Sequence, residues 1–148
     1  MAKDKLETLR KLAARRQLAL GIELQKLRAQ RVEQEAQAQS LQEMLGAYRS
    51  EAQASPSPHA SQLAMFSRFY ARVTQTLSSH DSHLQRLREA EHNGELSFHE
   101  AYRDHQAISR LQQTRAQQQA QVLKRKERRS DGARRWSMLN RTDEERNN

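Results

Sequence analysis

The sequence has no cysteine among its 148 residues, which excludes disulfides, thiol chemistry and cysteine-ligated zinc sites. It has only two prolines and four glycines, so few residues can interrupt a helix. β-branched residues are scarce, which argues against a sheet. The longest apolar stretch near the start, residues 18–22, is far too short for a membrane span or a signal peptide. We therefore expect a soluble cytoplasmic protein.

The residues that dominate the composition are Ala, Leu, Gln, Arg and Glu, all good helix formers. Hydrophobic residues make up 35% of the chain, charged residues 30%, and the mean hydropathy is −1.08. Such a chain has too few apolar side chains to offset the ordering entropy of a thick globule. It fits a thin all-α structure whose core is a seam between two helices, in a single domain over 1–148.

Apolar residues recur with a seven-residue period in two long segments, which predicts a helix over about 3–54 and another over about 61–130. The rows of the first helix are Leu6, Ala13, Leu20, Leu27, Gln34, Leu41 and Tyr48, flanked by Leu24, Ala38 and Leu45. The rows of the second helix are Leu63, Tyr70, Leu77, Leu84, Glu91, Phe98 and His105, and Phe66, Val73, His80, Leu87, Gly94, Ala101 and Ile108, continuing to Arg115 and Val122.

A Ser-Pro-Ser-Pro segment at 55–58 predicts a loop over about 55–60, because each proline pushes the residue before it out of the helical region. A short loop favours an antiparallel coiled-coil hairpin. If the turn is centred near residue 57, residue i faces about residue 114 − i, so that Leu27 lies near Leu87. Beyond about Leu111 the second helix has no partner, and we expect it to fray near Gly132 and to be disordered over about 137–148. At Gly94 we allow a kink or a short break, and we prefer a simple interruption to a functional hinge.

Charge is concentrated towards the two ends of the chain. Residues 1–31 carry nine basic and three acidic residues, and residues 110–135 carry nine and two, whereas residues 32–109 carry six and ten. A hairpin brings the two basic segments to its open end, where like charges repel each other. This pattern predicts an acidic partner at that end.

No motif for catalysis is present. There is no glycine-rich phosphate loop, and the serines and histidines of the segment 78–83 build no pocket on one exposed helix. His80 and His83 lack further ligands at a suitable spacing for a metal. We expect a protein that is not an enzyme and that has no cofactor, metal or small-molecule substrate.

The basic run 124–129, followed by Arg134, Arg135 and the lone Trp136, favours docking on an acidic protein, with Trp136 as an anchor. Nucleic-acid binding stays open as the less favoured interpretation, because aromatic residues are not interleaved with the basic ones. At the loop end, Phe69 lies one step off the seam and is expected to be exposed as a second docking point.

Several motifs resemble the FliJ family of flagellar export proteins and its YscO-type relatives in type III secretion. The opening residues 6–13, Leu45-Gly46-Ala47-Tyr48, and the spacing Phe69-x3-Val73-x2-Thr76-x3-His80 are similar to that family's patterns. The sequence departs from the family at Ala52, where a second tyrosine is expected, and at Thr76.

The resemblance implies a two-helix antiparallel coiled coil that looks like the central stalk of a rotary ATPase. It implies that the paired termini enter the hexameric export ATPase, that the other end contacts the cytoplasmic ring of the export gate, and that the protein escorts export chaperones at the inner membrane. The ATPase-facing residues would be Arg10, Lys11, Arg15, Arg16, Lys124, Arg125, Lys126, Arg128 and Arg129. The gate-facing residues would be Leu45, Tyr48, Phe69, Val73, Thr76 and His80. A coiled-coil adaptor or chaperone of another assembly is the alternative.

Overall fold

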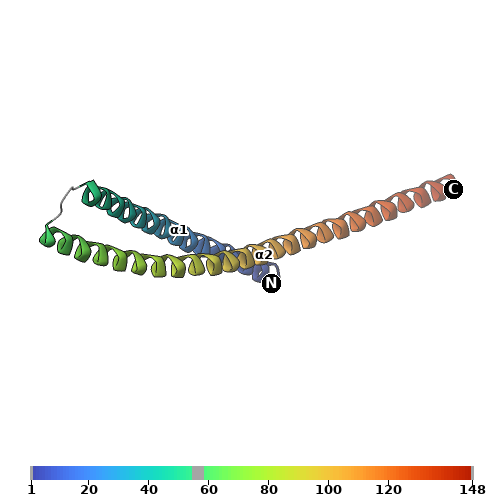
Figure 1. The fold of residues 1–148 in the computed structure, drawn as a ribbon. Helices are drawn as coiled ribbons and strands as arrows, with labels where there is room; N and C mark the ends of the chain where they lie inside the picture. The colour runs from blue at the N-terminus through green and yellow to red at the C-terminus, as the bar shows by residue number, and fades with distance from the viewer. Residues whose placement is uncertain (1, 55–58, 148) are drawn as a thin grey trace. The chain divides into compact units, whose positions relative to one another are not determined.

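The computed structural model describes residues 2–54 and 59–147, and over this part of the chain it contains two long helices and no strand (Figure 1). Helix α1 spans Ala2–Ala54 with 53 residues, and helix α2 spans Ala60–Arg146 with 87 residues. The two helices pack against each other, so the predicted all-α helical hairpin is confirmed. The predicted proline loop at 55–58 lies outside the described residues.

Helix α2 begins with a local cap at His59. The backbone N–H groups of Gln62 and Leu63 donate to the His59 carbonyl at 3.0 and 3.1 Å, and the His59 N–H donates to the Gln62 side chain at 3.3 Å. A Gln side chain three residues into a helix that accepts from the N-cap N–H is half of a capping box. The capping residue is therefore His59.

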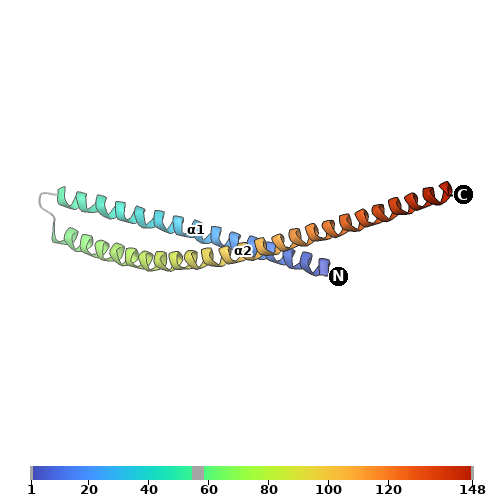
Figure 2. The same cartoon turned by 90° about the vertical axis from the view of Figure 1, so that its right-hand side faces the viewer.

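The chain divides into two compact units. One unit spans Arg15–Tyr102, and the other combines the chain up to Ala14 with the chain from Arg103 onward. In the first unit, the 15–54 part of α1 runs alongside the 60–102 part of α2 in both views (Figures 1 and 2). In the second unit, the start of α1 packs against the part of α2 that follows residue 103, and Leu6 is buried there.

The core is a thin seam on the predicted rows. None of the described large side chains is fully buried, which agrees with the small apolar content of the sequence. Beyond Gln112 the predicted rows of the second helix are not buried. Every described side chain after this residue is exposed. The buried apolar residues all fall on the predicted rows: Leu6, Leu24, Ala38, Val73, Leu84, Leu87 and Ala101.

The helices pair as predicted from the loop end to the hydrogen bond between Gln34 and His80, whose numbers add to 114, and the pairing differs from the predicted one farther along. Near the loop end, Tyr48 stacks on Phe66, and their numbers add to 114 as predicted. Farther along, the closest carbon of Phe98 lies 3.3 Å from where a Cβ on Gly21 would sit, and these numbers add to 119. The prediction assumed a turn symmetric about residue 57, whereas the fit of a large ring beside a glycine fixes the register.

Gly94 lies inside α2, which runs through it without a break. A Cβ built on Gly94 would lie 3.4 Å from Leu24 Cδ1 and 3.7 Å from Leu27 Cδ1. The missing side chain therefore lets two leucines of α1 approach the backbone of α2. Leu27 accordingly lies beside Gly94, which is seven residues, or about two turns, beyond its predicted partner Leu87.

Helix α2 extends to Arg146, past the predicted end near 130, and it includes the residues near Gly132 and from 137 to 146 where we expected fraying and disorder. The chain has no proline after residue 58, and one glycine lowers helix stability by only about 1 kcal/mol relative to Ala. The predicted overhang does exist, but it starts later. Ala2, Lys3 and Leu6 share a pocket with residues of α2 as far as Gln119, so the pairing reaches past Leu111.

Candidate partner-binding surfaces

The predicted basic surface begins with Arg10, which is engaged in a structural contact. Its guanidinium donates to the two carboxylate oxygens of Glu7 at 2.7 and 3.2 Å, and the Gln112 amide donates to the same carboxylate at 2.7 Å. The hydrogen bonds from Arg10 and then from Gln112 lower the pKa of Glu7 to about 2, and the Glu7 carboxylate raises the pKa of Arg10. Arg10 thus helps to join α1 to α2 and is half-buried.

The remaining predicted cations of α1, which are Lys11, Arg15 and Arg16, are exposed. Lys11 belongs to the unit that contains both chain ends, whereas Arg15 and Arg16 belong to the unit that spans Arg15–Tyr102. Arg16 has an interaction partner. The side chains of Lys11 and Arg15 are both exposed.

The basic run Lys124, Arg125, Lys126, Arg128 and Arg129 lies on the part of α2 that extends beyond the start of α1 (Figure 2). All of these side chains are exposed. The structure therefore does not place them side by side with the basic residues of α1, as the simple hairpin predicted. Lys3 of α1 and Arg115 of α2 instead line one pocket of about 250 Å³. The predicted register, in which residue i faces residue 114 − i, did not pair these two residues.

The predicted docking residue Trp136 is two-thirds exposed, and exposed apolar side chains follow it on the same helix. The exposed fraction is 67% for Trp136, 70% for Met138 and 65% for Leu139. A large apolar surface on a helix that is otherwise polar is a feature of binding sites. The structure thus leaves Trp136 available as an anchor.

At the loop end, aromatic side chains of α1 and α2 pack together. The ring centroid of Tyr48 lies 5.4 Å from that of Phe66 in a stacked arrangement and 4.5 Å from that of Phe69. Phe66 also lies 6.1 Å from Tyr70. Phe69 is half-buried and not exposed as expected, because the Tyr48 ring packs against it, and its role as a docking point stays a prediction.

The other predicted gate-facing residues mostly belong to the seam. Val73 is buried, Leu45 is half-buried, and the His80 Nδ1 is hydrogen-bonded to the Gln34 side chain at 2.8 Å. Thr76 is exposed, and its hydroxyl donates to the backbone carbonyl of Arg72. These residues are close together, but most of them stabilise the hairpin and present only part of their surface to a partner.

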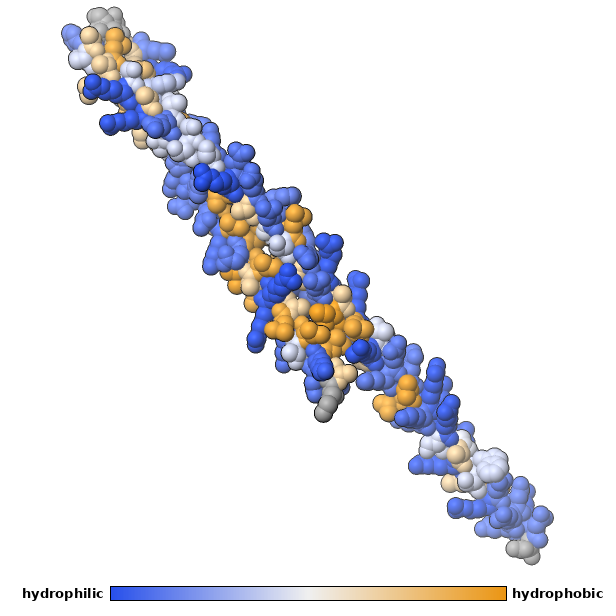
Figure 3. Space-filling model, turned by 90° about the horizontal axis from the view of Figure 1, so that it is seen from below, coloured by the Kyte–Doolittle hydropathy of each residue, from blue (hydrophilic) through white to orange (hydrophobic). Residues whose placement is uncertain are grey.

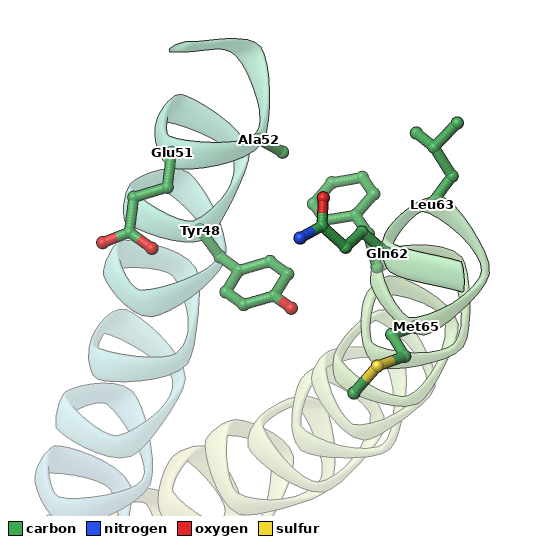
Figure 4. A pocket seen from close by; sticks show the side chains of 7 residues that line it. Tyr48, Glu51, Ala52, Gln62, Leu63 and Met65 are labelled. Carbon is green, nitrogen blue, oxygen red and sulfur yellow. The ribbon is translucent and has the colours of Figure 1, made fainter. Parts of the chain in front are cut away.

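A pocket of about 360 Å³ opens between the helices at this end (Figure 4). The Tyr48 ring points from α1 toward α2, and Met65 points back toward it. Leu63 and Met65 are 52% and 65% exposed, which makes them the open apolar residues of this end. Leu63 was predicted as a seam residue. Its exposure depends on how the two helices lie at this end, which the sequence pattern does not show. The pocket is lined by Tyr48, Glu51, Ala52, Gln62, Leu63, Met65 and Phe66.

Ion pairs cross the seam in the middle of the Arg15–Tyr102 unit. Arg31 donates to Glu91 at 2.6 Å and to Glu35 at 3.2 Å, and Arg28 reaches Glu91 at 3.3 Å and Glu95 at 3.0 Å. Hydrogen bonds from Arg31 lower the pKa of Glu91, and the carboxylate of Glu91 raises the pKa of Arg31. Because Arg31 and Glu91 occupy seam positions, they favour one register of the two helices.

Over the described residues, no group of three or more His, Asp or Glu side chains is arranged to hold a metal ion. Neither helix, within the same residues, contains a stretch long and apolar enough to cross a membrane.

The fold defines this chain as an α-helical hairpin protein, with an exposed basic segment on α2 and a pocket between the helices beside residues 48–66. The family model described as flagellar FliJ protein matches residues 2–130. The chain therefore belongs to the FliJ family of flagellar export proteins, and it is a component of the flagellar export apparatus. Comparison with curated proteins and with solved structures returned no match.

Proposed function

We propose that this protein is the central stalk of the export apparatus and acts by binding, without catalysing a reaction itself. In this proposal the end that holds both chain termini enters the hexameric export ATPase. The loop end contacts the cytoplasmic ring of the export gate, and the protein also escorts export chaperones. It does so in the cytoplasm, at the inner membrane. The proposal rests on membership of the FliJ family together with the distribution of charge and apolar surface described above.

The basic extension of α2 carries the proposal. Its five cations between residues 124 and 129 are exposed on a helix that has passed the end of its partner. An exposed row of cations attracts an acidic cavity over about 8–10 Å, the screening length at moderate ionic strength. Lys3, Lys11 and Arg115 add positive charge in the same unit. Arg10 acts indirectly, because it holds α1 to α2.

The pocket at the loop end supports the proposed contact with the gate. Leu63 and Met65 supply apolar surface there, and Glu51 lies at the rim. Exposed apolar surface with a polar rim is typical of protein-docking sites. Tyr48 lines the same pocket, and Phe69, Val73 and Thr76 follow it along α2.

The experiment that tests the stalk is an ATPase assay with the cognate export ATPase. The variant K124E/R125E/R129E reverses the charge of three exposed side chains. We expect the wild-type chain to stimulate hydrolysis and ring assembly, and the variant to lose most of that stimulation. The control variant R68E/R72E reverses two exposed arginines near the loop end and should retain it.

Other outcomes of these experiments would assign a different function to the protein. If the chain does not affect hydrolysis but binds generic duplex DNA with a steep salt dependence, the basic extension is a nucleic-acid surface. If it neither affects hydrolysis nor binds DNA, an adaptor or chaperone role within the apparatus replaces the stalk. If both charge variants lose stimulation equally, net charge and not the extension is responsible.

A further inference from the structure

Helix α1 carries a second apolar stripe on the side away from the seam. Leu18, Ile22 and Val32 are 66%, 46% and 57% exposed. With Gln25 and Ala29 between them, they recur at alternating spacings of four and three residues, which is the pattern of a coiled-coil seam. The intramolecular seam does not use them, because it is built on the neighbouring buried residue Leu24 and its row.

The stripe has room for another helix. Ala19 and Ala29 are exposed, and their small side chains would let a neighbouring backbone approach closely. Single exposed leucines are ordinary on a protein surface, but three large apolar residues on one stripe at coiled-coil spacing indicate an interaction surface. Figure 3 shows one face of the molecule, on which apolar side chains lie in separate groups among many polar ones.

The charge beside the stripe is mainly positive. Arg15 and Lys26 lie along one flank, and the only acidic residue between 15 and 32 is Glu23. Glu23 and Lys26 form an ion pair at 3.5 Å in which both side chains are about two-thirds exposed. Such exposed pairs are weak and exchange readily for a better partner. Glu33 closes the far end of the same flank.

We propose that the outer stripe of α1, formed by Leu18, Ile22, Ala29 and Val32 with Arg15 and Lys26, binds an amphipathic helix with acidic flanks from another protein, as a third strand on the hairpin. Apolar residues of that helix would cover the stripe, and its carboxylates would pair with the two cations. This surface lies on neither end of the hairpin, and the inference does not depend on the proposed stalk function.

A second copy of this chain is a poorer occupant. Each chain carries a formal net charge of +8, so association of two copies is opposed by repulsion. An antiparallel pairing that matches Ile22 with Val32 would also bring the Lys26 side chains of the two copies close together, near the symmetry axis. An acidic helix removes both costs.

The test uses two synthetic helical peptides of three heptads with Leu at the a and d positions. One carries Glu and the other Lys at the e and g positions. Binding of each fluorescein-labelled peptide to the full chain is measured by anisotropy. We expect the Glu peptide to bind at least about tenfold more tightly than the Lys peptide, and the variant L18Q/I22Q/V32Q to weaken it by at least about tenfold.

A matched control keeps this test specific. The variant L96Q/L123Q/L139Q replaces three leucines that are 57%, 60% and 65% exposed on α2, and it should bind the Glu peptide as the wild type does. Both variants change only exposed residues, and circular dichroism confirms that they remain helical. Equal binding of the two peptides, or equal weakening by the two variants, overturns the proposal.

Sedimentation equilibrium addresses the other occupant. We expect the wild-type chain to remain monomeric at micromolar concentration. A dimer that L18Q/I22Q/V32Q dissociates would assign the stripe to a second copy and contradict the proposal. Because that variant leaves residues 124–129 intact, it should still stimulate the export ATPase, so failure of this inference is distinguishable from failure of the stalk.

Discussion

Gly21 and Gly46 lie in the same helix but have different surroundings. A Cβ on Gly46 would meet no atom within 4 Å, whereas a Cβ on Gly21 would lie 3.3 Å from Cε2 of Phe98. Glycine inside a helix is less stable than alanine by about 1 kcal/mol. At Gly46 this cost brings no packing benefit, and at Gly21 it makes room for an aromatic ring.

We predict that G46A stabilises the protein and that G21A stabilises it less or not at all. At Gly46 the substitution should raise the free energy of unfolding by the full difference in helix propensity between glycine and alanine, about 1 kcal/mol. This corresponds to an increase in Tm of about 2–4 °C. At Gly21 the Phe98 ring must move by a few tenths of an ångström. Thermal unfolding followed by circular dichroism measures both. A larger gain at Gly21 than at Gly46 would show that the two helices are not packed as described.

The carboxyl group of Glu7 predicts a dependence of stability on pH. Its pKa of about 2 in the folded protein is below its ordinary value of 4.5, so its contribution to stability is present above about pH 4.5 and is lost as pH falls toward 2. The variant E7Q removes this group, and its free energy of unfolding should vary less with pH in that window. Urea titrations at several pH values between 2 and 5 check the expectation.

The causes of the Glu7 shift can be separated. Arg10 contributes the largest effect and Gln112 the next. We predict that R10M raises the pKa of Glu7 more than Q112L does, as measured by 13C NMR of the side-chain carboxyl carbon. The reverse order, or an unchanged pKa in R10M, would contradict the contacts seen at this end of the hairpin.

At the scale of single residues, the sequence identified the seam well and the exposed sites poorly. The rows through Leu24, Leu84 and Ala101 follow directly from the seven-residue period. Phe69 is half-buried because Tyr48 of the other helix packs against it. The periodic pattern of one helix does not show which residue of the other helix lies opposite. The contact between Arg10 and Glu7 is different, because the two residues lie three apart in one helix, and only the hydrogen bond from Gln112 to Glu7 depends on the partner helix.

At the scale of the helices, the periodic pattern predicted both elements but not their register. The pattern repeats every seven residues, so sliding one helix by about one turn keeps most apolar rows in contact. The fit of Phe98 beside Gly21 and of Leu24 beside Gly94 selects one of these arrangements. The polar contacts between Arg31 and Glu91 favour the same arrangement, with numbers that add to 122.

The ion pairs of the seam lead to a prediction that compares two glutamates. Glu91 is contacted by Arg28 and Arg31 and its side chain is 13% exposed, whereas Glu95 is contacted by Arg28 and its side chain is 40% exposed. Removing the charge of the less exposed partner leaves Arg31 inside the seam without its main counter-ion. We predict that E91Q lowers Tm more than E95Q does.

Thermal unfolding at low and at high salt measures the Tm of both variants. The difference between them should persist at high salt, since partly buried ion pairs are screened less than exposed ones. An equal effect of E91Q and E95Q would mean that the contacts with Glu91 do not hold the register. The double variant R31L/E91L should recover stability relative to E91Q, because no unpaired charge remains.

At the scale of the whole molecule, charge and burial are distributed in opposite ways. The buried side chains lie between Leu6 and Ala101, and every described side chain after Gln112 is exposed. Positive charge is concentrated over residues 1–31 and 110–135. The paired part of the hairpin therefore holds the buried side chains, and the extension of α2 leaves its cations exposed, as the proposed contact with an acidic partner requires.

This distribution predicts a gradient of hydrogen exchange along α2. A helix without a packed face is only marginally stable in water, so its amides open locally. Amide protons over residues 120–146 should exchange much faster than those over 73–101 in the isolated protein. Addition of the export ATPase should slow exchange in the extension. Equal protection of both segments in the isolated chain would show that something else covers the extension.

The hairpin register is the central claim, and the absence of cysteine makes it directly testable by disulfide formation. Leu27 Cδ1 would lie 3.7 Å from a Cβ on Gly94, whereas the symmetric turn places Leu27 beside Leu87. Mild oxidation of L27C/G94C should give a monomer with an internal disulfide on a non-reducing gel, and L27C/L87C should not. A disulfide in L27C/L87C alone would contradict the register, and disulfide-linked dimers in place of monomers would contradict the hairpin.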